Sequence, residues 1–428
     1  MRTLWVTTRS FPPAVRLLMV NQFAINLAFY MLMPYLAAHL AGELGLAAWA
    51  VGLVLGVRNF SQQGMFLIGG TLADRYGYKA PIMAGCLLRT AGFALLGWAD
   101  SLPALVAASA ATGFAGALFN PAVRAYLAAG AGERRVEAFA AFNVYYQAGM
   151  VLGPLVGLAL LAADFTLVCA VAAGIFAALT LLQGRSLPAA RRAGRSGPGE
   201  GVLAQWRVVA ANRPFLLFSL AMIGSYVLTF QVYLALPMAA GTLLGADGTK
   251  VTGGLFVLSA AVAVAGQLRL TAWAGRRWSR ERTMVRGLAA MGLAFVPLAL
   301  VAPAPVRTDR TAGTAAQLLA LAAAVVLLAA GSALIYPLEM DTVVTLSADR
   351  WVATHYGLYN TVSGLGITLG NLATGALWDF ARQRDALWLV WGALTLTGVV
   401  CAGAVLALAR TGRLTAPAPV PGPGPVAV

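Results

Sequence analysis

Residues 69–79 read Gly69-Gly70-Thr71-Leu72-Ala73-Asp74-Arg75-Tyr76-Gly77-Tyr78-Lys79 and join two long apolar runs. The paired glycines at 69 and 70 allow two backbones to approach closely, and Gly77 supplies a turn conformation that a Cβ atom disfavours. The stretch also places both signs of charge on a predicted loop of a few residues between two helices: Asp74, Arg75 and Lys79. A solvated tight turn is one interpretation of this pattern, and a functional loop is the other.

The composition limits the class of protein. Of the 428 residues, 60% are hydrophobic and only 11% are charged, which leaves too little polar surface for a soluble globule of this size. Apolar runs of about 20 residues, each long enough to cross the hydrocarbon core as a helix, recur along almost the whole chain. These runs are rich in Ala, Leu and Gly and lack the alternation of a membrane strand. The sequence therefore predicts an all-α membrane protein.

The formal charge of +15 is distributed asymmetrically. Arginines gather before the first apolar run and in alternate connections, above all around 185–213 and 276–286, whereas the other connections carry mainly acidic residues. This is the positive-inside pattern, which places both termini in the cytoplasm. The basic excess thus reflects topology, and no nucleic-acid partner is predicted. Lysine is nearly absent (Lys79 and Lys250 only), as is typical of a GC-rich bacterial genome, so we expect a bacterial cytoplasmic membrane.

Twelve predicted spans fall into two sets of six on either side of a polar connection. Residues 1–187 are predicted to form an N-terminal six-helix bundle, 188–212 a cytoplasmic linker with a short surface helix near 202–211, and 213–410 a C-terminal six-helix bundle. Residues 411–428 are rich in Pro and are expected to be disordered. The repetition predicts two bundles around a central cavity. The predicted spans are about 16–40, 47–73, 80–99, 102–129, 138–163, 165–187, 214–240, 251–275, 284–302, 315–342, 354–380 and 387–409.

The order Gly-x-x-x-Asp-Arg-x-Gly-x-Lys between the second and third spans resembles the signature loop of the major facilitator superfamily. Residues 275–282 occupy the same place in the second half and keep the basic residues without the acid. Residues 58–64 and 118–121, together with Arg124, resemble bacterial multidrug exporters of the MdtH type within that superfamily. The resemblance implies alternating access and a small-molecule substrate. It also implies that Asp74 holds the loop against the other bundle, through a basic side chain or a helix N-terminus.

Three glycines of the fifth span, Gly149, Gly153 and Gly157, recur every four residues, with Pro154 beside them. Small residues at this spacing permit close helix crossing, and proline kinks a helix, so a packing groove is one interpretation. The order Gly-x-x-x-Gly-Pro-x-x-Gly in this span also resembles a motif of drug:proton antiporters within the superfamily. That resemblance favours export.

Polar side chains inside the predicted spans mark a candidate substrate cavity. Arg58 lies far from both ends of its span, and a charge at that depth costs at least roughly 2.5–3.5 kcal/mol on insertion scales. We expect Arg58 to face the interior with polar partners among Gln62, Asn26 and Asn120. The other candidates lie on polar faces of the first and seventh spans or follow in the fourth: Gln22, Tyr30, Arg124, Tyr226 and Tyr233.

Groups that could carry a proton are few. The MdtH-type resemblance implies acidic residues where this chain has Asn21 and Asn120, and an amide cannot release a proton. Glu339 and Asp341 remain as possible proton-linked groups near one end of the tenth span, where they could also face water. The fixed charge of Arg58 further predicts a preference for neutral or anionic amphipathic compounds over quaternary cations.

We therefore predict a monomeric secondary transporter that exports lipophilic or amphipathic small molecules, coupled to protons. An importer or facilitator of a sugar or another metabolite is the alternative with the same fold. A membrane enzyme acting on diphosphates would need clustered acids, and a channel would not need two repeated halves. The three cysteines lie in three different spans, so neither a disulfide nor a metal site is predicted, and no cofactor is expected: Cys86, Cys169 and Cys401.

Overall fold

The computed structural model describes residues 2–188, 201–244, 248–301 and 310–414. Within these ranges the chain is almost entirely α-helical, and no strand occurs in them. A helix satisfies all of its central backbone N–H and C=O groups internally, which is what a chain with such apolar runs requires in lipid. The all-α class predicted from composition is confirmed.

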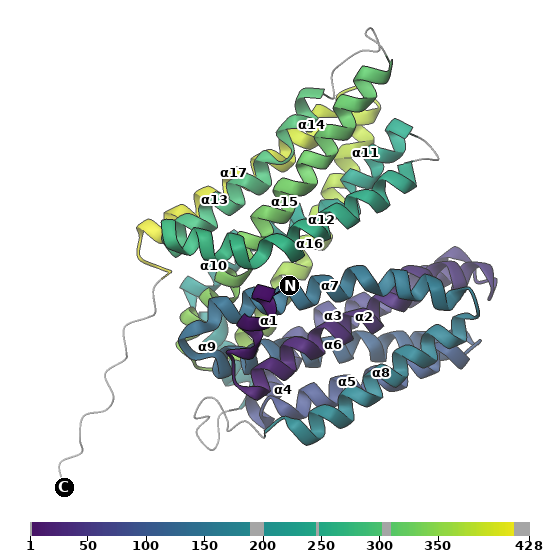
Figure 1. The fold of residues 1–428 in the computed structure, drawn as a ribbon, viewed down its shortest axis with the longest axis vertical. Helices are drawn as coiled ribbons and strands as arrows, with labels where there is room; N and C mark the ends of the chain where they lie inside the picture. Colours follow the sequence, from purple (N-terminus) through teal and green to yellow (C-terminus); the bar gives the residue numbers. More distant parts are fainter. Residues whose placement is uncertain (1, 189–200, 245–247, 302–309, 415–428) are drawn as a thin grey trace, which may run out of the picture.

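Helices α2 to α8 form an N-terminal group (Figure 1). In this group α2 packs against α7 and α8, and α5 packs between α6 and α8. A short helix, α1, precedes the group and was not expected from the sequence. The bounds are α1 Arg2–Arg9, α2 Pro13–Gly42, α3 Ala48–Gly64, α4 Phe66–Tyr76, α5 Lys79–Trp98, α6 Leu102–Ala131, η1 Gly132–Arg134, α7 Arg135–Leu161 and α8 Phe165–Ser186.

Helices α10 to α17 form a C-terminal group, in which α13 packs against α15 and α17, and α12 against α15. The helix α9 lies between the two groups in sequence and confirms the surface helix predicted near 202–211. The bounds are α9 Val202–Ala211, α10 Arg213–Phe230, η2 Gln231–Tyr233, α11 Ala235–Leu244, α12 Gly248–Arg277, α13 Arg280–Leu293, α14 Val296–Val301, α15 Arg310–Ser347, α16 Val352–Arg382 and α17 Trp388–Arg410.

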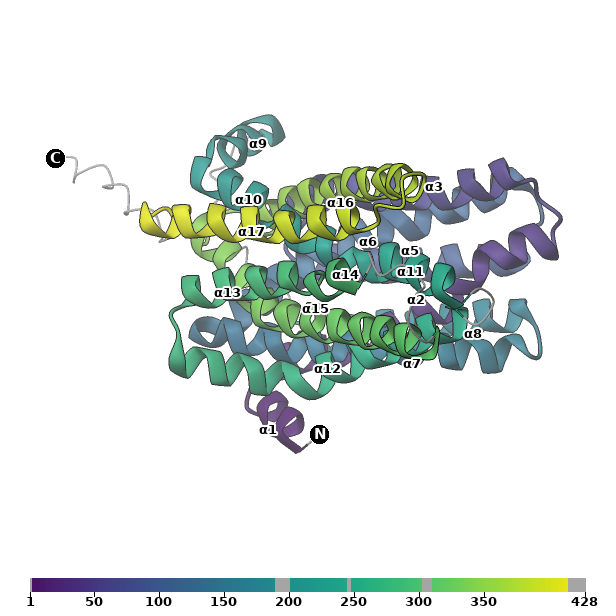
Figure 2. The same cartoon turned by 90° about the horizontal axis from the view of Figure 1, so that it is seen from above.

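The two groups pack against each other through helices of both. In that interface α16 packs against α4 and α6, while α7 packs against α12 and α15. The groups lie together where α9, the C-terminal end of α4 and the N-terminal end of α16 are found, and they diverge toward the opposite end (Figures 1 and 2). We call the first of these the linker end. The interface therefore places side chains from distant parts of the sequence opposite one another.

Nine stretches in the described residues are long and apolar enough to cross a membrane. One of them, Leu102–Leu161, contains both α6 and α7. The helices α3, α4 and α16 are not among the nine, although the sequence predicts spans at 47–73 and 354–380. The structure thus supports a multi-pass helical membrane protein, and the number of crossings stays a prediction.

Two predictions about the second span need correction. The expected uninterrupted helix is divided at Met65, whose φ of −105° and ψ of 6° are not helical. The expected loop at 69–79 is mostly helix, because α4 continues to Tyr76 and α5 begins at Lys79. Only Gly77, with φ at 83°, and Tyr78 stand between them. Asp74 and Arg75 therefore lie on a helix end, and the turn conformation predicted for Gly77 is confirmed.

Candidate functional site

The Asp74 carboxylate lies against the N-terminus of α16. It accepts backbone N–H groups from Ala353 at 3.1 Å and Thr354 at 2.7 Å, and the Thr354 hydroxyl at 2.7 Å. The first N–H groups of a helix have no acceptor within the helix and carry partial positive charge. A carboxylate supplies both the missing acceptor and a compensating negative charge. Of the two partners expected for Asp74, the helix N-terminus is the one found.

Gly69 and Gly70 make this contact possible on two sides of α4. A Cβ atom on Gly70 would lie 2.1 Å from the Ala353 carbonyl oxygen, and one on Gly69 would lie 1.9 Å from that of Ala117. Both distances are far below van der Waals contact, so the predicted close backbone approach is confirmed. The first glycine seats α4 on α6 within its own group, and the second seats it on α16 of the other group.

The other members of the stretch have local roles. The Lys79 ammonium donates to the Gly184 carbonyl at 2.8 Å and so ties the start of α5 to the end of α8. Arg75 is exposed. Neither side chain takes part in the Asp74 contact, so within this stretch the packing on α16 rests on Asp74 and Gly70.

Helix α9 contacts both sides of this junction. The Gln205 side-chain amide donates to the Thr354 hydroxyl at 2.7 Å, and Trp206 Nε1–H donates to the Thr71 hydroxyl at 2.8 Å. Thr354 belongs to the C-terminal group and Thr71 to the N-terminal group. The linker helix is thus bound to both groups beside Asp74, a contact that the sequence pattern did not indicate.

A second charged contact joins the groups at the linker end. Arg135 at the start of α7 reaches Asp341 of α15 at 2.8 Å and Asp349 at 3.3 Å. Arg280, from the C-terminal group itself, binds the other carboxylate oxygen of Asp341. A buried carboxylate needs compensating charge, and Asp341 receives it from both groups.

The turn between α15 and α16 holds Asp349 in an unusual backbone conformation. Ala348, Asp349 and Trp351 all have positive φ, between 49° and 55°. Non-glycine residues rarely adopt this region, and it costs roughly 1–3 kcal/mol per residue when it persists. The turn is held by the Asp349 ion pair with Arg135 and by the Asp74 contact that follows it at the start of α16.

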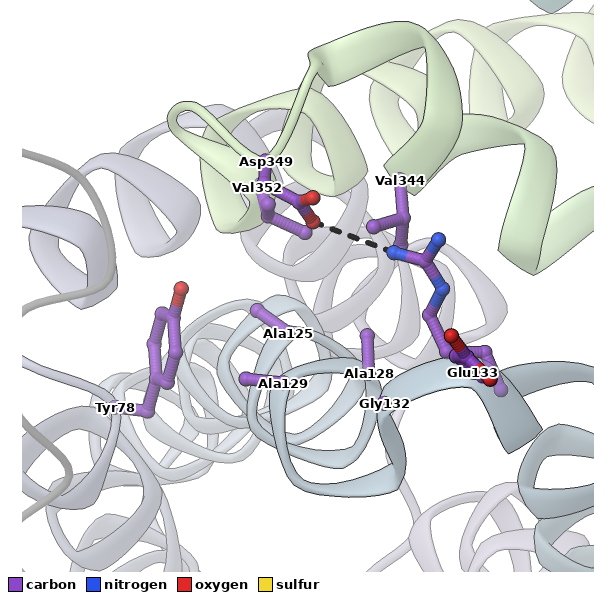
Figure 3. Close-up of a pocket in the computed structure, with 10 residues that line it drawn as sticks. Tyr78, Ala125, Ala128, Ala129, Gly132, Glu133, Val344, Asp349 and Val352 are labelled. Carbon is purple, nitrogen blue, oxygen red and sulfur yellow. Dashed lines mark hydrogen bonds and ion pairs between the residues drawn. The ribbon is translucent and has the colours of Figure 1, made fainter. Parts of the chain in front are cut away.

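A cavity of about 510 Å³ lies beside these contacts (Figure 3). Tyr78 and Ala125 line it from the N-terminal group, and Asp349 and Val352 from the C-terminal group. None of the polar residues predicted for a central cavity is among its lining residues. It therefore belongs to the junction at the linker end.

The sequence left open that Glu339 and Asp341 face water at the end of their span, and this alternative is wrong. Each is only 3% exposed. Glu339 accepts a hydrogen bond from the Tyr359 hydroxyl of α16, whose ring packs edge-to-face with Tyr226 of α10 at 6.0 Å between centroids. Unlike Asp341, Glu339 has no ion pair with a described residue. It is a buried acid held by hydrogen bonding among aromatic rings.

Two further polar contacts cross between the groups. Arg124 of α6 donates to the Asn360 side-chain oxygen of α16 at 2.7 Å. Asn143 of α7 donates to Gln267 of α12 at 2.7 Å, and Gln267 donates in turn to the Ala333 carbonyl of α15 at 2.6 Å. The sequence analysis identified Arg124 but missed Asn143 and Gln267, because a lone amide in an apolar run does not reveal its partner.

The predicted partners of Arg58 were wrong. Its guanidinium donates to the neighbouring Asn59 at 2.5 Å, while no described hydrogen bond joins it to Gln62, Asn26 or Asn120. Asn26 instead donates to the Gln22 carbonyl one turn earlier at 2.8 Å. Arg58 Nε is buried without an acceptor, as is Gln22 Oε1. The polar side chains of α2 are therefore present as predicted, but they supply no hydrogen-bond acceptor to Arg58.

The aromatic candidates lie at the interface. Tyr30 packs edge-to-face on Phe29 with 5.2 Å between ring centroids. Tyr233 is 48% exposed, and its hydroxyl contacts the sulfur of Met150 on α7 at 3.4 Å. Asn120 is partly buried on α6. Tyr30 and Tyr233 lie within electrostatic reach of each other, so the first and seventh predicted spans do present aromatic side chains to one region.

The glycines of the fifth span pack against α2. Cβ atoms on Gly149 and Gly157 would lie 2.4 Å from the Phe23 carbonyl oxygen and 2.0 Å from that of Met31. A Cβ atom on Gly153 would meet the Tyr30 side chain at 2.7 Å. The Pro154 carbonyl accepts a hydrogen bond from Tyr35 at 2.7 Å. The close packing predicted from the spacing is confirmed, and the antiporter interpretation stays a prediction.

These features define a helical membrane protein of the transporter class, with two helix groups joined at one end by polar contacts. Residues 18–371 match the family model of the Major Facilitator Superfamily, and the chain belongs to that family. It is 55% identical over 392 residues, 92% of each chain, to an uncharacterized MFS-type transporter of Mycobacterium tuberculosis. It is 30% identical over 389 residues, 90% of this chain and 91% of the relative, to the multidrug resistance protein MdtH of Salmonella typhi. Like those relatives, it is a transporter and not an enzyme.

Proposed function

We propose that the protein exports lipophilic or amphipathic small molecules by alternating access, driven by protons. The relatives named as multidrug resistance proteins support export of such compounds, at 29–30% identity over about nine-tenths of the chain. The contacts at the linker end support alternating access, since they are polar, few and made between two helix groups. The Asp74 contact with the start of α16 carries this part of the proposal.

The proposed architecture has twelve crossings in two bundles of six. In this arrangement α3 and α4 together form the second crossing, α10 to α11 the seventh, α13 and α14 the ninth, and α16 the eleventh. Both termini and the linker lie in the cytoplasm, as the distribution of arginine favours. The membrane is then the bacterial cytoplasmic membrane, and the functional unit is a monomer.

The structure corresponds, on this proposal, to the outward-facing state with its cytoplasmic side closed. The linker end is the cytoplasmic end, and Asp74, Arg135 and α9 keep it shut. Export then requires these contacts to form after the substrate enters from the cytoplasm and to break before the next cycle. Each is a hydrogen bond or ion pair that water can replace when the groups separate.

Glu339 is the proposed proton-carrying group. It is a buried acid with no ion pair in the described part of the chain, and its hydrogen-bond donor Tyr359 is the neighbour of Asn360, which accepts from Arg124 of the N-terminal group. A carboxyl in such a place can be protonated in one state and ionised in the other. Asp341 is less suited to this role, because its carboxylate is already paired with two arginines.

The substrate preference follows from the fixed charge of Arg58. We propose that neutral and anionic amphipathic compounds are exported better than quaternary cations. The deciding experiment measures accumulation of a lipophilic dye in cells with and without the protein, each with and without an uncoupler. Lower accumulation that the uncoupler reverses is expected. Equal accumulation in all four cases for neutral, anionic and cationic dyes would contradict export, and higher accumulation would favour the importer.

A further inference from the structure

We propose that Arg58 and Arg89, which flank the ring of Phe29, form a subsite for the anionic group of the substrate. This inference rests on the proposed transport function and specifies which chemistry the N-terminal group recognises. Arg89 was not identified as a candidate from the sequence, although it stands near the middle of the apolar run that became α5.

Phe29 of α2 lies within cation–π distance of both guanidiniums. The Arg58 Cζ atom is 5.4 Å from the Phe29 ring centroid, and the Arg89 Cζ atom is 5.0 Å from it. Arg89 also lies 5.3 Å from the ring of Phe176 on α8. Both distances to Phe29 fall within the range in which a cation is attracted to an aromatic face. The two charges are thus brought to one place by helices α2, α3 and α5.

The donors of this pair are not used up within the protein. Nε of Arg58 and Nε of Arg89 are both buried without an acceptor. Arg89 is only 6% exposed, and no described hydrogen bond or ion pair involves its side chain. A guanidinium has five N–H donors and cannot be deprotonated. A cation–π contact attracts the charge of the guanidinium. It does not accept hydrogen bonds from the N–H groups, which point outward in the plane of the guanidinium.

No acidic residue in the described part of the chain forms an ion pair with Arg58 or Arg89. Within residues 2–188 the acids are confined to helix ends and connections: Glu43, Asp74, Asp100, Glu133, Glu137 and Asp164. Arg58 and Arg89 lie close enough to repel each other, and they share Tyr30 as a neighbour. Arg89 is buried and Arg58 is half-buried, and two like charges so placed are costly unless an anion joins them. A carboxylate or sulfonate would supply the missing acceptors in the planar geometry that arginine prefers.

The surroundings also fit the remainder of such a substrate. The rings of Phe29, Phe93 and Phe176 follow one another with centroids 6.4 Å and 5.3 Å apart, and Tyr30 adjoins Phe29 toward the interface between the groups. Aromatic walls accept apolar bodies of varied shape while a few polar groups fix orientation. Phe93 and Phe176 are fully buried in the bundle core, so Phe29 and Tyr30, which are partly exposed, are the rings that a substrate would meet. The subsite therefore fits an aromatic carboxylate or sulfonate whose ring packs against Phe29 and Tyr30.

The test uses three fluorescent compounds with one aromatic body: pyrenebutyrate, pyrenebutanol and pyrenebutyl-trimethylammonium. Their binding to the purified full-length protein is measured in nanodiscs of phosphatidylcholine, so that no anionic lipid competes. We expect pyrenebutyrate to bind most tightly and the quaternary cation most weakly. Arg89→Gln should weaken pyrenebutyrate binding roughly tenfold or more, as expected for a lost charge-assisted contact, and change pyrenebutanol binding little.

Controls separate a binding role from a structural one. Arg282→Gln removes the same charge from an exposed position of α13 and should leave all three affinities unchanged. Arg89→Lys keeps the charge without the planar donors and should lie between wild type and Arg89→Gln, and Arg58→Gln should reproduce the loss. Each variant is first checked for the elution volume and thermal stability of the wild type.

Equal affinity of the wild type for the three compounds would overturn the proposed subsite. An equal loss for all three compounds in Arg89→Gln would do so too, because it would assign Arg89 a structural role. Export is measured separately in proteoliposomes with pyrenebutanol. Export of pyrenebutanol without any preference for pyrenebutyrate in binding would overturn the subsite and leave the proposed function intact. Anion-selective binding without export of either compound would support the subsite and contradict the proposed function.

Discussion

The carboxylate of Asp74 accepts both the backbone N–H and the hydroxyl of Thr354, each at 2.7 Å, from a residue 280 positions further along the chain. Thr354 in turn accepts a hydrogen bond from Gln205 of the linker helix. One threonine therefore connects the signature stretch, the start of α16 and the linker. The stability of the closed linker end should depend on this small set of atoms.

Asp74→Asn should strongly reduce transport without removing the protein from the membrane. The asparagine keeps one acceptor oxygen and turns an NH₂ group toward the N–H groups of α16, so the closed state loses a charge-assisted contact of roughly 1.5–3 kcal/mol. Transport rates in proteoliposomes, normalised to protein, test this. Asp379→Asn, at an exposed position near the other end of α16, is the matched control. Normal transport by Asp74→Asn would reduce the stretch to a structural turn.

Gly70→Ala should open the linker end by sterics alone. Its Cβ atom would lie 2.1 Å from the Ala353 carbonyl oxygen, so α4 and α16 must separate at a cost of roughly 1–3 kcal/mol. Cysteine accessibility at the linker end should rise accordingly. Gly375→Ala adds the same methyl group within α16, where nothing lies within 4 Å, and should have no such effect. Equal accessibility in both variants would contradict the close packing.

Trp206→Phe should loosen the linker helix while keeping the aromatic ring. The change removes the Nε1–H that donates to Thr71, a neutral hydrogen bond worth roughly 0.5–1.5 kcal/mol. Hydrogen exchange of α9 should therefore become about two- to tenfold faster. Leu203→Ala, at a residue that is 77% exposed on the same helix, serves as the control. Unchanged exchange in Trp206→Phe would show that this bond does not hold α9.

Glu339→Gln should uncouple transport from protons. Glutamine can still accept the hydrogen bond from Tyr359 but cannot bind and release a proton. We expect efflux driven by an imposed pH gradient to be lost, while exchange of labelled for unlabelled substrate persists without a gradient. Glu43→Gln, at an exposed acid near the end of α2, should behave as the wild type. Undiminished pH-driven efflux by Glu339→Gln would exclude this carboxyl as the coupling site.

Glu200→Cys should be protected from a membrane-impermeant thiol reagent in intact cells, because the linker is predicted to be cytoplasmic. Asp100→Cys, in a connection predicted to face outward, should react under the same conditions. The native cysteines are buried and give little background. Labelling of position 200 from outside would invert the proposed topology.

The sequence predicted the features that are set within a single helix, such as its position in the chain and the spacing of its glycines. Apolar runs located most of the helices, and glycine spacing located the close packing of α7 on α2. The resemblance implied two types of partner for Asp74, a basic side chain or a helix N-terminus, and the structure shows the second. The division of the second span at Met65 was not predicted, although the mostly polar residues at 58–64 give way there to the apolar residues at 65–68.

Contacts between elements were harder to predict. The partners of Asp341 come from α7 and α13, far away in sequence, and its burial could not be read from its place near the end of an apolar run. Arg89 is different, because the argument applied to Arg58 also holds for a charge in the middle of α5. The cost of inserting a charge identifies such residues, but it does not say which aromatic rings receive them.

The double pairing of Asp341 has a kinetic consequence. In the proposed transport cycle the helix groups separate and Arg135 leaves with α7, whereas Arg280 belongs to the same group as Asp341 and stays bound to it. Removing the sole partner of a buried charge costs roughly 3–5 kcal/mol, and retention of Arg280 avoids most of that penalty. Only Arg135 then loses its partner, and water hydrates its guanidinium. In that cycle Asp341 is never without a counter-ion, so the barrier to opening should stay low and the closed end should re-form readily.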